Sequence, residues 1–409
     1  MPSLALATFL IALTYAGLVV ALTLALLRPP LPRAARVRHD WPAIDVVVPA
    51  RDEAEALPEA LASLRAQDYP GRFLIWVVDD RSHDATAALV RQAAERDARV
   101  RLVQVKEPSR RLAPKVNAVA HGIAAGTAAW IVTTDADCVH PRGWLRALLR
   151  AAGERDVMVS GYVETARFGT ARGLFARIEA LDWSALMITN RALMRLGACV
   201  ASSANNQAYR RAAFEAIGGF GVAGRAPSGD EDLLVQRFAT LPSARMAFTD
   251  APDARVLTAS TGSWLGFLRQ RRRWVSRYHH PQHYRPAFLA GIGLLGVHSV
   301  SLSLTTLSAS VWPASLPWLV ASWVVVLAAV IAGMRVGLGR LGRRDLMGWP
   351  LWVWALLHPF VITTAVLWSL VRPGSWRAGA ERYRRRWWRA WWRVQWRRAW
   401  RRRSSGDAP

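Results

Sequence analysis

Four long apolar segments constrain the fold of this 409-residue chain more than any other feature. The first, residues 4–27, contains no charged side chain and is long enough to cross a bilayer as a helix. It has neither a preceding basic stretch nor a clear small-residue cleavage site, so we expect a retained signal-anchor within residues 1–30. Nearer the carboxyl end, residues 287–333 predict a transmembrane helical hairpin. Residues 349–371 predict a transmembrane or re-entrant segment that is broken at Pro359.

The distribution of positive charge predicts how these segments are oriented. The net charge is +25, and residues 374–409 alone contain twelve arginines interleaved with seven tryptophans. Such a mixture directly after an apolar segment is typical of a membrane surface with anionic lipids, and we prefer this to a nucleic-acid-binding or merely solvated tail. Basic clusters at 28–38 and 335–344 also predict a cytoplasmic soluble region in a bacterial-type inner membrane. A single crossing at 349–371 would place the basic tail outside, so we expect that segment to bend at Pro359.

Between these membrane segments, short β-rich runs alternate with helical stretches. The expected strands are 44–50, 74–80, 100–105 and 129–137. The expected helices after them are 53–66, 84–96, 114–124 and 142–152. Apolar strands that alternate with helices predict an α/β domain, with a mainly parallel sheet covered by helices on both faces. We assign this domain to residues 44–280.

Acidic or polar residues follow three of the predicted strands, at 49–53, 79–82 and 135–137. In parallel sheets ligands bind at the carboxyl ends of the strands, so these three clusters predict one site. Neither a GxGxxG nor a Walker A sequence follows any of the strands, and the phosphates of a nucleotide would need another partner. Asp135 and Asp137, one residue apart, can hold Mg²⁺ or Mn²⁺ that carries a diphosphate.

The order of these motifs resembles that of the membrane-bound family 2 glycosyltransferases, whose nucleotide-diphospho-sugar-binding fold is called GT-A. VVVPARDEAEALPEALASLRAQDYP resembles the family's first strand and helix, VVDDRSHDAT its nucleotide-binding turn, and TTDADCVHP its metal motif. KVNAVAHGI and ANNQAYRRAAFEAIGGF resemble the segments on either side of that motif, GDEDLLVQRF the catalytic-base motif, and QRRRW (270–274) the Gln-x-x-Arg-Trp signature. The similarity covers residues 44–280. HPF and SWRAGAERYRRR are also similar to a subgroup associated with hopanoid and carotenoid glycosylation, although Arg377-Ala378-Gly379 departs from its pattern.

The resemblance implies roles for particular side chains. Asp79 and Asp80 would bind the base and ribose of the nucleotide, and Asp135 and Asp137 the metal. Asp232 would act as the general base that deprotonates the acceptor hydroxyl. The full set of residues implied to bind the nucleotide sugar is Pro49, Asp52, Glu53, Asp79, Asp80, Lys115, Asp135, Gln270, Arg273 and Trp274.

Simpler explanations stay open for several of these residues. Ser82 or Asp84 can cap the following helix, whether or not the turn binds a nucleotide. Asp232 lies in the acidic first turn of a predicted helix at 231–240, which is favourable to the helix dipole without any chemistry. The arginines at 269–273 can bind lipid headgroups.

The resemblance implies a family 2 glycosyltransferase of the hexosyltransferase type in the inner membrane. We expect it to move a sugar from a UDP- or GDP-sugar to a hydroxyl of a lipid or polyprenoid acceptor, with a divalent metal and with inversion. A processive polysaccharide synthase is the alternative, but three or so full crossings provide little wall for a polymer channel. An inactive membrane scaffold is the non-enzymatic alternative, and the complete set of aspartates argues against it. Nucleic acid is not an expected partner.

Overall fold

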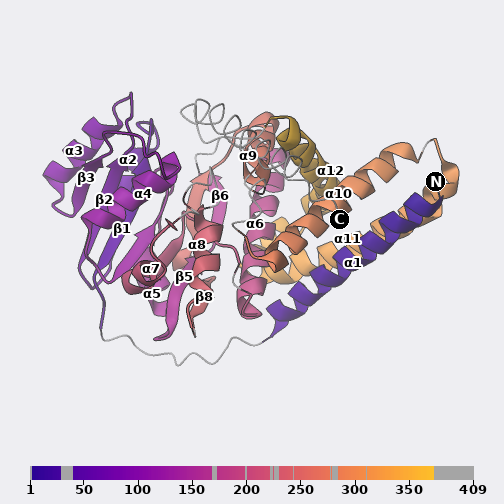
Figure 1. Cartoon of the computed structure of the whole chain (residues 1–409), viewed down its shortest axis with the longest axis horizontal. Coiled ribbons are helices and arrows are strands. Elements are labelled where there is room, and N and C mark those ends of the chain that lie inside the picture. Colours follow the sequence, from indigo (N-terminus) through magenta and orange to yellow (C-terminus); the bar gives the residue numbers. More distant parts are fainter. Residues whose placement is uncertain are drawn as a thin grey trace, which may run out of the picture.

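Figure 1 shows an α/β domain on one side of the molecule and long helices on the other. The structure is a computed structural model and describes residues 2–28, 40–167, 173–198, 200–221, 224, 230–242, 244–276, 278, 284–309 and 311–372. The predicted interfacial tail at 374–409 lies outside these residues.

The domain is built on a mainly parallel sheet, as predicted. In chain order its strands are β1 (Ile44–Ala50), β2 (Phe73–Asp79), β3 (Val100–Gln104), β4 (Trp130–Thr133), β5 (Asp156–Gly161), β7 (Gln207–Arg210) and β8 (Arg245–Thr249). Across the sheet the order is β3-β2-β1-β4-β7-β5-β8, and only β7 runs antiparallel to its neighbours β4 and β5 among these described strands. A separate parallel ribbon consists of β6 (Val163–Arg167) and β9 (Val256–Ala259).

The three strands that carry the predicted acidic clusters are neighbours. β2, β1 and β4 lie side by side and parallel, so their carboxyl ends meet at one edge of the sheet. β1 is buried along its whole length, as expected of a central strand covered on both faces. β4 ends at Thr133, earlier than predicted, and the chain then turns at Asp135, whose main-chain oxygen accepts from the N–H of Cys138 at 3.2 Å. Asp135 and Asp137 therefore lie on this turn.

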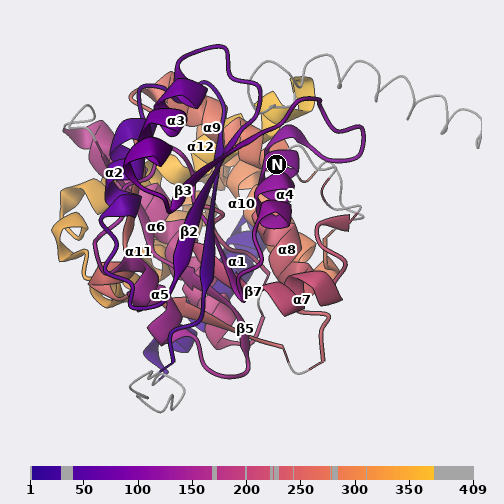
Figure 2. The same cartoon turned by 90° about the vertical axis from the view of Figure 1, so that its left-hand side faces the viewer.

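Helices cover both faces of the sheet through separate apolar clusters (Figure 2). Those of the first face are α2 (Leu57–Arg65), α3 (Thr86–Arg96) and α5 (Trp144–Ala151). Those of the second face are α4 (Pro114–Ala125), α7 (Arg211–Ala216) and α8 (Asp230–Phe238). Val46 and Val48 of β1 belong to the first cluster and Val47 to the second, because successive side chains of a strand point to opposite faces. The predicted α/β class is confirmed.

In the described part of the chain, four helices are long and apolar enough to cross a membrane. They are α1 (Pro2–Leu27), α10 (Pro286–Ser308), α11 (Leu316–Arg340) and α12 (Trp349–Val371). All four coincide with the segments identified in the sequence. The predicted break at Pro359 is wrong, because α12 continues through it as one helix. Proline removes one backbone donor, and a long helix that packs against other helices tolerates this loss.

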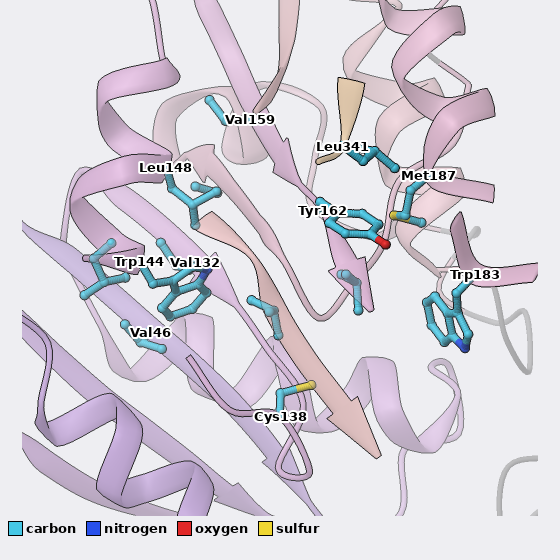
Figure 3. Packing of buried hydrophobic residues seen from close by; sticks show 14 of the residues in the cluster. Val46, Val132, Cys138, Trp144, Leu148, Val159, Tyr162, Trp183, Met187 and Leu341 are labelled. Carbon is cyan, nitrogen blue, oxygen red and sulfur yellow. The ribbon is translucent and has the colours of Figure 1, made fainter. Parts of the chain in front are cut away.

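A continuous core joins the domain to these helices. α6 (Leu174–Arg195) contributes Trp183 and Met187 to the same buried cluster as Val132 of β4 and Leu341, which follows α11 (Figure 3). α9 (Trp264–Ser276) packs against α12.

Ion pairs reinforce the junction. Arg343, between α11 and α12, pairs with Glu164 of β6. Burial acts to lower the pKa of the Arg343 guanidinium, but hydrogen bonds to Asp345 and the charge of Glu164 raise it overall, so Arg343 stays protonated. The α/β domain and the long apolar helices are thus parts of one packed unit.

Candidate active site

Hydrogen bonds join the turn after β1 to the turn after β2, so that the two turns form one edge of the candidate site. The N–H of Asp52 donates to Ser82 Oγ at 3.0 Å, and Asp52 Oδ1 accepts from the N–H of His83 at 2.7 Å. The N–H of Glu53 donates to Thr86 Oγ1 at 2.9 Å. Asp52 and Glu53, which were predicted to bind the donor, thus hold the two turns together.

Two residues of this edge have a left-handed backbone conformation. φ is 54° at Asp52 and 59° at Arg81, values that non-glycine residues seldom adopt. Conformations of this kind persist where surrounding bonds enforce them, and they cluster at ligand-binding sites. Here the bonds between the two turns supply the enforcement.

Asp79 is the last residue of β2 and Asp80 follows it. Their side chains are 4% and 0% exposed. Asp79 Oδ1 accepts from the N–H of Ser82 at 3.1 Å, so this carboxylate does shape the turn. Asp80 Oδ1 accepts from Arg81 Nε at 2.9 Å, and a guanidinium nitrogen of Arg51 lies 3.6 Å from Asp80 Oδ2. Asp80 Oδ2 accepts no hydrogen bond from any described residue and retains capacity for a ligand.

Asp135 and Asp137 occupy the turn after β4, and both are half-buried. Lys115, in the first turn of α4, places its Nζ 2.7 Å from Asp135 Oδ1. Burial, together with the charges of Asp137 and Asp135, raises the pKa of the Cys138 thiol, and Mg²⁺ and Mn²⁺ prefer carboxylate oxygens to sulfur. The turn therefore offers carboxylate oxygens as its metal-binding atoms.

His140 holds this turn in place. Its Nε2 lies 2.7 Å from Thr134 Oγ1, and its Nδ1 lies 3.0 Å from Ser63 Oγ of α2. The imidazole also packs on Trp144 of α5, with ring centroids 4.1 Å apart. The position of the acidic turn is consequently set by two helices of the first face.

A narrow hollow opens beside the acidic turn, between β4, β7 and the first turns of α4 and α8. Its charged and amide side chains are Lys115, Asp135, Gln207 and Glu231, and Pro49 of β1 also lines it. Figure 2 shows α4 and α8 on the same face of the sheet. Of the predicted donor-binding residues, the structure thus brings Pro49, Lys115 and Asp135 into one hollow.

Asp232, the predicted base, lies on α8 and is 2% exposed. Its Oδ1 accepts from the N–H of Ser202 at 3.2 Å, and the Ser202 hydroxyl donates to Ser160 Oγ of β5 at 3.1 Å. The neighbouring Glu231, rather than Asp232, is among the described residues that line the hollow. The role of Asp232 as base stays a prediction.

Gln270, Arg273 and Trp274 lie on α9, at the junction with the membrane helices. The Trp274 ring meets the Trp183 ring of α6 edge to face, with centroids 5.2 Å apart. Gln270 Oε1 accepts from the guanidinium of Arg271, which in turn stacks 4.2 Å from the Trp274 ring. None of the three predicted residues is among the described lining of the hollow, so their contact with a donor stays a prediction.

A divalent metal fits the acidic turn only in a complex of three parts, in which the carboxylates and the diphosphate of the donor both bind the metal. Among the described residues, no group of three or more His, Cys, Asp or Glu side chains could hold a metal ion. Mg²⁺ and ions like it are commonly bound by one or two carboxylates together with substrate phosphates and water. Asp135 already faces one cation, the Lys115 ammonium, so the turn is suited to compensating positive charge.

The sheet order and the acidic turns at its edge define a GT-A fold. Residues 45–218 match the family described as Glycosyl transferase family 2. This part of the chain therefore resembles a glycosyltransferase family 2 domain, and the match together with the named relatives supports a glycosyltransferase.

Relatives and a solved structure show the same similarity. An N-acetylglucosaminyltransferase of Rhizobium meliloti is 26% identical over 326 residues, which cover 75% of this chain and 73% of the relative. One of Mesorhizobium japonicum is 24% identical over 239 residues, covering 58% and 55%. The mannosyltransferase PcManGT from Pyrobaculum calidifontis, solved in complex with GDP-Man and Mn²⁺, has a TM-score of 0.60 at 21% identity, covering 90% of this chain and 98% of its own. That likeness confirms the predicted fold.

Gln207 and Glu231 line the hollow but were not predicted from the sequence. Gln207 is the first residue of β7 and lies within the motif ANNQAYRR. The available signal was a polar residue at the start of a buried strand, since a buried amide side chain needs a hydrogen-bond partner in the protein or in a ligand. Glu231 lies next to Asp232 in the first turn of α8, and only the direction that each side chain takes from the helix determines which of them lines the hollow.

Proposed function

We propose that this glycosyltransferase moves a sugar from a nucleotide diphosphate donor to a hydroxyl of a lipid or polyprenoid acceptor at the membrane surface. The observation that supports it most is the convergence of three acidic turns at one edge of the sheet, beside Lys115. The packed junction between domain and membrane helices supports a membrane acceptor.

The donor is a UDP- or GDP-sugar bound along this edge. Asp79 and Asp80 accept hydrogen bonds from the base and ribose, and Asp80 Oδ2 is the acceptor with capacity for one. Lys115 contributes positive charge to the diphosphate. Asp135 and Asp137 hold Mg²⁺ or Mn²⁺, which when bound neutralises the diphosphate and stabilises the charge on the leaving group.

Transfer is a single displacement with inversion. The acceptor oxygen attacks the anomeric carbon as the bond from that carbon to the diphosphate oxygen breaks, and the nucleoside diphosphate leaves with the bonding electron pair. Asp232 takes the proton of the acceptor hydroxyl. The hydrogen bond from the N–H of Ser202 to Asp232 Oδ1 holds this carboxylate on α8.

The acceptor reaches the site from the membrane side, past α6 and α9. Gln270, Arg273 and Trp274 form the wall between the donor and this entrance. We place the domain in the cytoplasm and the helices in the inner membrane, because the sequence has basic clusters directly after the first apolar segment and at the end of the predicted hairpin. The weak similarity of HPF and SWRAGAERYRRR to the hopanoid- and carotenoid-associated subgroup is consistent with a polyprenoid acceptor.

A donor screen tests this proposal. Full-length protein in detergent, with Mn²⁺ or Mg²⁺ and a lipid extract, is given UDP- and GDP-sugars, and release of the nucleoside diphosphate is measured. UDP-N-acetylglucosamine comes first, because two relatives are named N-acetylglucosaminyltransferases. We expect one preferred donor and a lipid with one or two added sugars by mass spectrometry. A long polymer would instead support a processive synthase, and the absence of release with every donor would contradict transfer.

A further inference from the structure

Gln207 carries a buried polar atom that the fold itself does not use. The side chain is 3% exposed, and its Oε1 has no hydrogen-bond partner among the described residues. Leaving a buried carbonyl without a partner costs roughly as much as losing a hydrogen bond, so few are kept without a reason. A ligand that supplies the missing donor would be such a reason.

The register of the sheet places Gln207 at the centre of the candidate site. It is paired with Thr133 of β4 on one side and with Ser160 of β5 on the other, both antiparallel. Side chains of directly paired residues project from the same face, so these three form a polar row across the strands. Asp135 follows Thr133 by two residues at one end of the row.

The other end of the row leads to the proposed base. Ser160 Oγ accepts from Ser202, and the N–H of Ser202 donates to Asp232. Gln207 therefore lies between the proposed metal carboxylates and the proposed base. In a direct displacement, the transferred sugar also lies between the metal and the base.

The hollow that Gln207 lines is suited to one small polar group. It is shared with Lys115, Asp135 and Glu231, and its volume is only about 10 Å³. That is about the room of one water molecule. A hydroxyl or an amide N–H of a sugar fits such a hollow, while the ring itself stays above it.

We propose that Gln207 Oε1 accepts a hydrogen bond from a hydroxyl or acetamido N–H of the transferred sugar and thereby selects the donor. This rests on the proposed function. It adds to that function the residue that distinguishes donors with this hydroxyl or acetamido group from donors without it. A site that hydrogen-bonds a substrate group discriminates strongly against analogues that lack it.

The test compares Gln207→Met with Gln67→Met. Gln67 is also buried, but both ends of its amide are bonded: Nε2 donates to the oxygens of Ser63 and Pro141, and Oε1 accepts from the N–H of Leu145. In full-length protein without donor, Gln207→Met should keep or slightly raise the Tm, whereas Gln67→Met should lower it. With donor, Gln207→Met should lose roughly 10- to 100-fold in kcat/KM.

Donor analogues identify the contact itself. The probes are UDP-N-acetylglucosamine, analogues that each lack one hydroxyl, and UDP-glucose, which lacks the acetamido group; a different donor from the screen would be replaced by its own series. Wild type should lose at least about tenfold with one analogue, and Gln207→Met should lose nothing further with that same analogue. Equal losses in both proteins for every analogue, or a fall in Tm matching that of Gln67→Met, would overturn the proposal. No turnover by wild type with any donor would instead remove the proposed function, and this contact with it.

Discussion

Removing the carboxylate of Asp182 should destabilise the junction between the domain and the membrane helices. Asp182 lies on α6, is 5% exposed, and accepts from Arg271 Nε of α9 at 2.6 Å and from Trp354 Nε1 of α12 at 3.3 Å. Arg271 is itself 3% exposed. Asp182→Ala therefore leaves a buried guanidinium without its counter-ion, at the place where three helices meet.

The magnitude follows from burial. Removing one partner of a buried ion pair costs about 3–5 kcal/mol, because the remaining charge is desolvated without compensation. The control is Asp68→Ala, whose carboxylate pairs with Arg146 while both side chains are about one-third exposed (35% and 33%). Exposed pairs of this kind contribute at most about 1 kcal/mol. Asp182→Leu combined with Arg271→Met should recover much of the loss, because it removes both buried charges at once.

Thermal unfolding of the full chain in detergent measures the difference. We expect Asp182→Ala to lower the Tm by on the order of 5–10 °C and Asp68→Ala to lower it by no more than about 2 °C. Equal and small shifts for the two variants would refute this reasoning, since they would mean that the buried pair does not hold α9 and α12 to α6. A double variant no more stable than Asp182→Ala would argue that shape, rather than charge, was lost.

Three further predictions concern the acidic edge and a surface turn. Asp135→Asn should lower Mn²⁺-dependent transfer about 100-fold with little change in Tm, whereas comparable losses of Tm and activity would indicate a folding role. Lys115→Met should raise the donor KM roughly tenfold, as steady-state kinetics will show, because a charge-assisted contact to the diphosphate is lost; an unchanged KM would remove Lys115 from the donor site. A hydrogen bond from Arg99 depresses the pKa of Asp97 well below its ordinary value of 3.8, so its stabilisation is fully present above that value and is lost progressively as the pH falls toward the depressed pKa. Asp97→Asn should therefore lower the Tm at neutral pH and by clearly less near pH ~2, and an equal effect at both would contradict the depressed pKa.

Local sequence patterns predicted the strands of the parallel half well. IDVVVPA at 44–50 forms β1 with the predicted bounds, because a short apolar run between turns has few other places to be buried. The end of β4 was predicted too late, and the residues after it make contacts such as the hydrogen bond from the Thr134 hydroxyl to the main-chain oxygen of Asn205, 71 residues further along the chain. No local pattern contains such a contact.

The candidate site was predictable to a similar extent. Asp79, Asp80 and Asp135 were found because parallel strands bring their carboxyl ends to one edge, whatever the side chains in between. Gln207 was not found, because its importance arises from pairing with Thr133 and Ser160, and antiparallel pairing of β7 could not be deduced from its four residues. The partners of α9 were equally hidden, since Arg271 and Asp182 are 89 residues apart.

The most direct test of the central claim is metal-dependent binding of the nucleoside diphosphate product, which needs no knowledge of the acceptor. Isothermal titration calorimetry of the full chain in detergent should show UDP or GDP binding with Mn²⁺ and little binding with EDTA. We predict that Asp137→Ala abolishes the effect of Mn²⁺, while Asp68→Ala, which changes a carboxylate of the exposed Arg146 pair, preserves it. Binding that is equally tight without metal, or unchanged in Asp137→Ala, would contradict the assignment of this edge as the donor site.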